Sequence, residues 1–210
     1  MSFPIPIASV LTGATIPQLA YWRRHTDAAP PLLVPQGKRS GRYLYSWADV
    51  VALRSIVYLR QEKSLPRIRR AVATLRGLEA GEWTNLAAYR LISTHRSILV
   101  QTPNGELLDL EDQPGTVLEE ILMHDVLAPF QTRSGRPVPA LEHPRPRIAV
   151  NPKVLGGYPV IAGTRVPFDV VASLAEDDLG PSEIAAVYPS IDQEAIGDAV
   201  SFAEQVAAVA

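Results

Sequence analysis

The chain of 210 residues contains no cysteine, only two methionines, and aromatic side chains at 7% of its positions. The absence of cysteine excludes disulfide bonds and metal sites built on thiolates. No apolar run approaches the ~20 residues that a membrane-spanning helix needs. The N-terminus, Met-Ser-Phe-Pro-Ile-Pro, lacks the basic start and long apolar core of a signal peptide. We therefore expect a cytoplasmic protein that does not contact a membrane.

The net charge is only −2, but the two signs are separated along the chain. Residues 1–78 carry 12 Lys and Arg against 3 Asp and Glu, a net charge of +9, whereas residues 79–210 carry 8 against 19, a net charge of −11. Clustered cations release condensed counterions from phosphates, so the first third predicts binding to nucleic acid. DNA would repel the acidic remainder, which we expect to bind another protein or a second copy of itself.

The first part of the chain predicts two short helices around a glycine turn. Ile7–Thr12 ends at Gly13, a typical helix stop, and Thr15 is an N-cap for a second helix that runs to about Arg24. Trp22 falls on the apolar face of that second helix and is expected in the core. Such a pair is either a helix-turn-helix or any helical hairpin, and the spacing alone leaves both interpretations open.

A basic loop and a short strand follow, where Gly41-Arg42-Tyr43-Leu44-Tyr45 alternates in the manner of a strand and predicts a wing. Two further helices are expected over Trp47–Glu62, capped by Ser46, and over Pro66–Leu78, after Ser64.

These motifs, in this order over about residues 7–78, resemble the DNA-binding head of MerR-type regulators. The resemblance is carried by Leu11-Thr12-Gly13-Ala14-Thr15, Gln18-Leu19, Tyr21-Trp22-Arg23, Gly41–Ser46 and the later Leu-Arg and Ile-Arg pairs. It implies that the second helix enters the major groove and the wing binds the phosphate backbone. The implied groove residues are Thr15, Gln18, Tyr21, Arg23 and Arg24, and the implied wing residues are Lys38, Arg39, Arg42 and Tyr43.

Two features depart from that family. Gly81 and Trp83-Thr84-Asn85 interrupt the long dimerisation helix that normally follows the head, and the metal-sensing members use cysteines, which this chain lacks. A metal sensor of that kind is therefore not expected.

The middle of the chain predicts a β-rich segment over residues 79–130. Strands are expected at Leu91–Ser93, Ser97–Thr102 and Glu106–Asp109, with a hairpin turn at residues 103–105 and a helix over Gly115–His124. This segment is either a small insert or a place where two protomers pair. The proline-rich residues 131–147 are predicted to be a linker.

Residues 148–210 predict a small helical domain, with a strand at Ile148–Val150 and helices over Phe168–Asp177, Pro181–Tyr188 and Asp192–Val209. The last two helices meet at a second corner of helix-turn-helix type. The string from Gly157 to Pro167, with Gly163-Thr164-Arg165-Val166-Pro167 at its end, resembles small antitoxin-like domains that accompany PIN-domain ribonuclease toxins. Together with the head, it resembles the larger, two-domain VapB antitoxins.

Several arginines are candidates for contact with a toxin. Arg165 follows a glycine turn and either reaches a partner or braces a carboxylate of its own domain, such as Asp169, Asp177 or Asp178. The other candidates are Arg133, Arg136, Arg145 and Arg147.

The sequence contains no pattern of residues that indicates catalysis. The four histidines are scattered without metal-ligand spacing, no nucleophile and base pattern is present, and the glycines near residue 157 match no phosphate-binding loop. We expect no enzyme, no metal and no cofactor.

The sequence thus predicts an α+β protein, mainly α with small β elements, that is the antitoxin of a VapBC-like module. It would neutralise a PIN-domain toxin, bind palindromic operator DNA as a homodimer and repress its own operon. The alternative is a MerR-like, ligand-responsive transcriptional regulator without a toxin partner.

Overall fold

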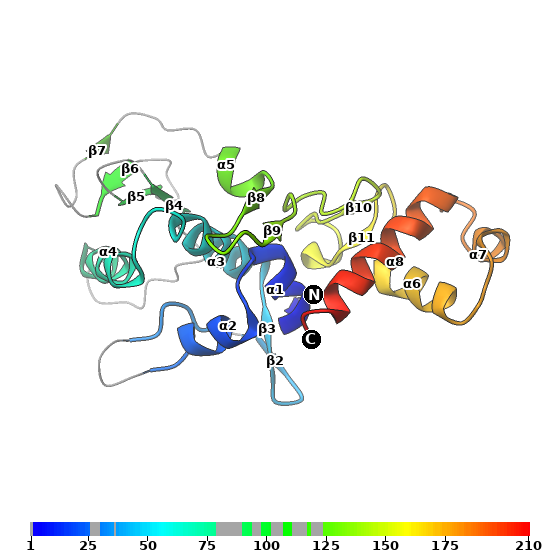
Figure 1. The fold of residues 1–210 in the computed structure, drawn as a ribbon, viewed down its shortest axis with the longest axis horizontal. Helices are drawn as coiled ribbons and strands as arrows, with labels where there is room; N and C mark the ends of the chain where they lie inside the picture. The colour runs from blue at the N-terminus through cyan, green and yellow to red at the C-terminus, as the bar shows by residue number, and fades with distance from the viewer. Residues whose placement is uncertain are drawn as a thin grey trace.

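The computed structural model describes residues 2–25, 30–35, 37–78, 90–93, 98–101, 107–110, 117–118 and 124–210. The described elements are helices and small antiparallel sheets, so the predicted α+β class is confirmed. Figure 1 shows the elements of the first third on one side, the last three helices on the other, and the two chain ends meeting between them.

Two short helices surround Gly13, as predicted: α1 (Ile5–Thr12) and α2 (Ile16–Trp22). Gly13 ends α1 with a φ of 77°, and a Cβ there would lie 2.5 Å from a methyl group of Val138, so only glycine fits. The Thr15 hydroxyl accepts from the Gln18 amide and the Gln18 side chain accepts from the Thr15 amide, which forms a capping box. The buried side chain of Trp22 confirms its predicted place in the core.

A three-stranded sheet contains β1 (Phe3–Pro4), β2 (Gly37–Arg39) and β3 (Arg42–Tyr45), with β3 in the middle. Ser40 and Gly41 form a two-residue turn, and both have positive φ angles, 50° and 77°, as tight hairpins require. The strand predicted over residues 41–45 is therefore confirmed, and the turn fixes the direction in which the hairpin projects.

Helix α3 (Trp47–Leu59) is the centre of the core, and α4 (Leu65–Leu78) follows it. Ser46 and Asp49 form a second capping box at the start of α3, as the Ser46 cap predicted. Burial raises the pKa of Asp49, although its hydrogen bonds from Ser46 oppose the shift. Helix α3 packs against α1, β4 and α5, and so orients the elements around it.

The side chain of Arg54, on α3, is completely buried, and all of its hydrogen-bond partners among the described residues are carbonyl oxygens. Its guanidinium donates to the carbonyls of Leu11 at 2.5 Å, of Ala128 and Pro139 at 2.7 Å each, and of Val126. Burial lowers the pKa of Arg54 to about 9, which leaves it charged at neutral pH. One side chain thus joins α1, α3 and the chain between residues 126 and 139.

The middle segment forms a four-stranded meander: β4 (Arg90–Ser93), β5 (Ile98–Gln101), β6 (Leu107–Asp109) and β7 (Val117–Leu118). The three predicted strands are confirmed, while the turn predicted at residues 103–105 lies outside the described residues. The helix predicted over Gly115–His124 is wrong at Val117–Leu118, which form β7, with Leu118 opposite Leu107 of β6. His124 is helical and begins α5, and the rest of that prediction lies outside the described residues. The pairing of β7 with β6 outweighs local helix propensity at these two residues.

Residues 124–147 pack onto the first third. Helix α5 (His124–Leu127) precedes a small hairpin of β8 (Phe130–Gln131) and β9 (Pro137–Val138). Val138 and Leu141 are buried, and the Leu141 amide donates to the Leu127 carbonyl at 2.9 Å. The stretch that its prolines predicted to be a linker is thus folded against α1 and α3 as far as Leu141, while Arg145 and Arg147 at its end contact α8 (Gln193–Ala207).

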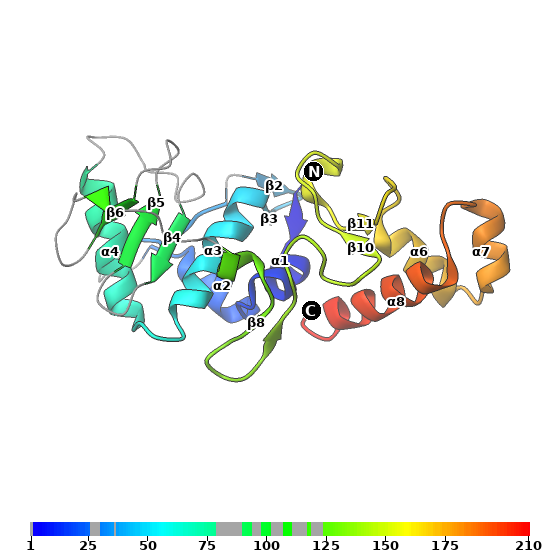
Figure 2. The same ribbon diagram turned by 90° about the horizontal axis from the view of Figure 1, so that it is seen from above.

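The last part contains β10 (Ile148–Ala149), β11 (Val160–Ile161), the 3₁₀ turn η2 (Leu155–Gly157), α6 (Phe168–Glu176), α7 (Pro181–Val187) and α8 (Gln193–Ala207). Strands β10 and β11 pair, and α6 packs along α8. The rings of Phe168 and Phe202 meet edge to face, with 4.8 Å between their centroids. The predicted strand and the three predicted helices are confirmed. Figure 2 shows α7 at the end furthest from the N-terminal elements.

The two ends of the chain share one apolar core. Gly157 has a φ of 90°, and a Cβ there would lie 3.2 Å from the ring of Phe3 and 3.4 Å from that of Trp47. Helix α1 also contacts α8. Buried apolar residues form one cluster from Phe3 to Phe202, so the C-terminal helices are packed against the N-terminal elements. Among the described helices, none combines the length and the apolar character needed to cross a membrane.

Replacing Arg54 by Met should lower the free energy of unfolding by at least about 3 kcal/mol, because buried carbonyls would lose their donors. Urea unfolding at neutral pH measures the change. Arg60→Met is the matched control, since Arg60 caps the end of the same helix and its side chain has no hydrogen bond within the described residues; its effect should stay within about 0.5 kcal/mol. Equal stability of the two variants would contradict the role given to Arg54.

Candidate nucleic-acid interface

Helix α2 and the β2–β3 hairpin lie on the same side of the molecule and project away from the C-terminal helices (Figure 1). The capping box fixes the start of α2, and the Ser40–Gly41 turn fixes the tip of the hairpin. The nine residues predicted to contact DNA all lie on these two elements or just after α2. The structure therefore brings the predicted DNA-contacting residues onto one side.

The predicted groove residues differ in how free their side chains are. Tyr21 and Arg24 are exposed, and Tyr21 has 48% of its surface accessible. Thr15 and Gln18 are exposed too, but they are joined in the capping box, which leaves the side-chain amide NH₂ of Gln18 as the group available to a ligand. Arg69 of α4 lies over the Tyr21 ring at 5.4 Å and donates to the Pro30 carbonyl at 2.9 Å.

Arg23 is directed toward the hairpin instead of outward from α2. It donates to the Tyr45 hydroxyl at 2.8 Å and lies 4.6 Å from the centre of the Tyr43 ring, and Lys38 lies 4.5 Å from that same ring. Burial raises the pKa of Tyr45, while the hydrogen bond and charge of Arg23 oppose the shift. Arg23 thus fastens the hairpin to the end of α2, while Lys38 of β2 stabilises the hairpin itself through the same ring.

The exposed cations of this side form no ion pair with any described residue. They are Arg24, directly after α2, and Lys38, Arg39 and Arg42 of the hairpin. Unpaired cations on the hairpin and at the end of α2 create a positive potential that can attract phosphate.

The five arginines predicted to contact a toxin fall in three places. Arg147 donates to Glu194 at 2.7 Å and pairs with Asp192 at 3.1 Å, and these acids raise its pKa. Arg145 donates to the Gln205 side chain at 3.0 Å. Both side chains are thus committed to α8 of their own chain.

Arg165 is exposed and, in the part of the chain that the structure describes, has no hydrogen bond or ion pair. Asp169, one of the carboxylates it was expected to brace, accepts a hydrogen bond from the Tyr158 hydroxyl at 2.7 Å instead. Burial raises the pKa of Tyr158, and this hydrogen bond raises it further.

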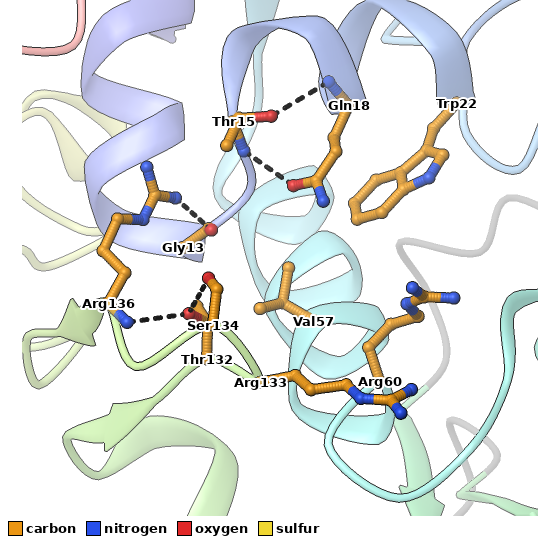
Figure 3. Close-up of a pocket in the computed structure, with 10 residues that line it drawn as sticks. All are labelled: Gly13, Thr15, Gln18, Trp22, Val57, Arg60, Thr132, Arg133, Ser134 and Arg136. Atoms are coloured by element: carbon orange, nitrogen blue, oxygen red, sulfur yellow. Dashed lines mark hydrogen bonds between the residues drawn. The ribbon is translucent and has the colours of Figure 1, made fainter.

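Arg133 and Arg136 lie beside α2, far from α8. They line a pocket of about 320 Å³ together with Thr15, Gln18 and Trp22. Figure 3 shows Arg136 directed toward the Gly13 carbonyl, to which it donates a hydrogen bond. Arg60 lines the same pocket, and sequence reasoning missed it because nothing near it in the chain points to residues 132–136.

Removing the ring of Tyr43 should loosen the hairpin. Tyr43→Ala loses two cation–π contacts of about 0.5–1 kcal/mol each, so the free energy of unfolding should fall by about 1–2 kcal/mol. Hydrogen exchange of the β2 and β3 amides should also become faster. Tyr43→Phe retains the ring and should match the wild type; if it behaves like Tyr43→Ala, the cation–π contacts do not hold the hairpin.

Comparison with known proteins finds a family model, a solved structure and a curated protein that are similar to the chain. Residues 148–203 match the family described as Protein of unknown function (DUF433). The crystal structure of Rv2018 from Mycobacterium tuberculosis is similar in fold, with a TM-score of 0.50 and 13% sequence identity, over 95% of this chain and 100% of that one. The likeness therefore extends over nearly the whole arrangement of elements.

The chain is also 30% identical, over 168 residues, to the uncharacterized protein y4eO of Sinorhizobium fredii. The match spans 73% of this chain and 75% of that protein. The chain belongs to the same protein family as y4eO.

Proposed function

We propose that the chain is a DNA-binding antitoxin without enzymatic activity, whose N-terminal elements bind operator DNA in the manner of MerR-type heads. The observation that carries the DNA-binding part is the placement of α2 and the β2–β3 hairpin on one side, with exposed cations on the hairpin and directly after α2 that form no ion pair within the described residues. In this proposal α2 reads the major groove through Tyr21, Arg24 and the Gln18 amide. Lys38, Arg39 and Arg42 bind the phosphates beside it.

Arg23 and Tyr43 have a positioning role in this proposal. Because Arg23 is held by Tyr45 and Tyr43, it sets the angle between α2 and the hairpin more than it reads bases. A single head reads few base pairs, so the proposal includes a homodimer on a palindromic operator.

The acidic C-terminal part is the proposed site for a partner protein. Residues 148–210 carry 9 Asp and Glu against 2 Lys and Arg. The resemblance to VapB antitoxins supports a PIN-domain ribonuclease toxin as the partner, in the cytoplasm. Arg165 is the candidate to enter the toxin's carboxylate pocket, since Arg145 and Arg147 are occupied within the chain.

A second candidate is a ligand-responsive regulator without a toxin. It is favoured by a pocket of about 580 Å³ between the hairpin and the first residues of the chain, lined by Ile5, Ile16 and Leu44 together with Arg39 and Arg42. An apolar ligand there would contact the hairpin directly and could change its angle.

Neutralising the hairpin should weaken DNA binding and its dependence on salt. Arg39→Gln and Arg42→Gln should each lower affinity for the duplex upstream of the chain's own reading frame, and each should reduce the slope of log affinity against log salt by about 1. Fluorescence anisotropy over a series of salt concentrations measures both. Lys153→Gln, an exposed cation of the C-terminal part, should leave both unchanged. Unchanged affinity and slope in the hairpin variants would exclude this DNA face.

Charge reversal at Arg165 should weaken capture of the partner. When the tagged chain is expressed with its neighbouring reading frame, a small protein that is toxic alone should elute with it. Arg165→Glu should reduce its yield at least about tenfold, as expected when a charged contact becomes repulsive. Lys153→Glu makes the same charge change nearby and should retain the partner. A homodimer that elutes without any partner would favour the ligand-responsive regulator.

A further inference from the structure

The arginine pocket lies between α2, the end of α3 and the β8–β9 hairpin. Its volume is about 320 Å³, and it is lined by Thr15 and Gln18 from α2, Arg60 from the end of α3, and residues 132–136 of the hairpin. The indole of Trp22 and the side chain of Val57 supply apolar walls (Figure 3). Three elements distant in sequence thus enclose a space large enough for a small polar group.

Three guanidinium groups line this pocket and no acidic side chain does. Arg136 is anchored, because its guanidinium donates to the Gly13 carbonyl and its backbone amide donates to the Thr132 hydroxyl at 3.0 Å. Arg60 and Arg133 differ, since neither side chain has a hydrogen bond or ion pair within the described residues. Figure 3 shows both extending toward the same end of the pocket, below Trp22.

Two unpaired guanidinium groups at one end of a pocket repel each other unless an anion lies between them. The neighbouring hydroxyls of Thr132 and Ser134 lie 3.0 Å apart and line the same space, so the site also offers neutral hydrogen-bonding groups. A phosphoryl group matches this set, because it carries several acceptor oxygens and binds arginine in a bidentate manner.

We propose that this pocket binds a phosphoryl group between Arg60 and Arg133. The phosphoryl group belongs either to the DNA backbone next to α2 or to a free phosphorylated small molecule. The first source rests on the proposed function, because Thr15 and Gln18 line the pocket and also belong to the proposed DNA face. The second source does not depend on it.

The test compares Arg60→Gln and Arg133→Gln with the wild type in two arms. In the first arm, isothermal titration calorimetry measures binding of inorganic phosphate against a chloride background of equal ionic strength. In the second, anisotropy measures affinity for the upstream duplex and for an unrelated duplex of equal length, over a series of salt concentrations. Lys153→Gln is the control, an exposed cation outside the pocket and outside both proposed binding sites.

If the DNA backbone supplies the phosphoryl group, each variant should bind both duplexes about tenfold more weakly, the loss of one charged hydrogen bond. Its salt slope should be smaller by about 1. If a free molecule supplies it, the wild type should bind inorganic phosphate, each variant should lose that binding, and affinity for DNA should not change. Lys153→Gln should match the wild type in both arms.

The proposal is overturned if the pocket variants match the wild type in both arms, even when the hairpin variants show that the chain binds DNA. If the wild type binds no duplex, the proposed function fails, and the phosphate arm alone decides for or against the pocket. Urea unfolding shows whether both pocket variants are folded, and their free energies of unfolding are expected to lie within about 0.5 kcal/mol of the wild type.

Discussion

The buried guanidinium of Arg54 joins the parts of the molecule that local sequence does not hold together. It binds carbonyls of α1, of the chain after α5 and of Pro139, so the β8–β9 hairpin is fixed against the α1–α2 turn. A buried charge without an acid is stable only when its donors are satisfied, and here backbone oxygens do so. Without this contact, neither the arginine pocket nor the contact between Gly13 and Val138 would have a defined geometry.

The separation of charge along the chain has a counterpart in space. Cations of the hairpin and of α2 remain exposed and unpaired among the described residues, whereas Arg147 is neutralised by acids of α8. Exposed ion pairs contribute little to stability, so the unpaired cations cost the fold little and remain available to an anionic ligand. This contrast between the two ends supports the proposed division into a DNA-binding side and a protein-binding side.

Elements with local signals were predictable. Gly13, the Thr15 and Ser46 caps, and the apolar stripes of the C-terminal helices each determine structure within a few residues. Leu118 was predicted to be helical because its strand partner, Leu107, lies eleven residues earlier and leaves no local signal. Arg23 was predicted to contact the DNA groove. Its hydrogen bond to Tyr45 joins residues 22 positions apart, so the local sequence gives no sign of it. Likewise, Arg60 and Arg133 line the same pocket only because of tertiary packing.

The proposed DNA face is tested most directly by hydrogen exchange measured with and without the duplex upstream of the chain's own reading frame. Binding through α2 and the hairpin predicts slower exchange at residues 15–24 and 37–45, with the helices after residue 168 unchanged. Slower exchange confined to the C-terminal helices, or no change at α2 and the hairpin while the duplex is bound, would contradict that assignment.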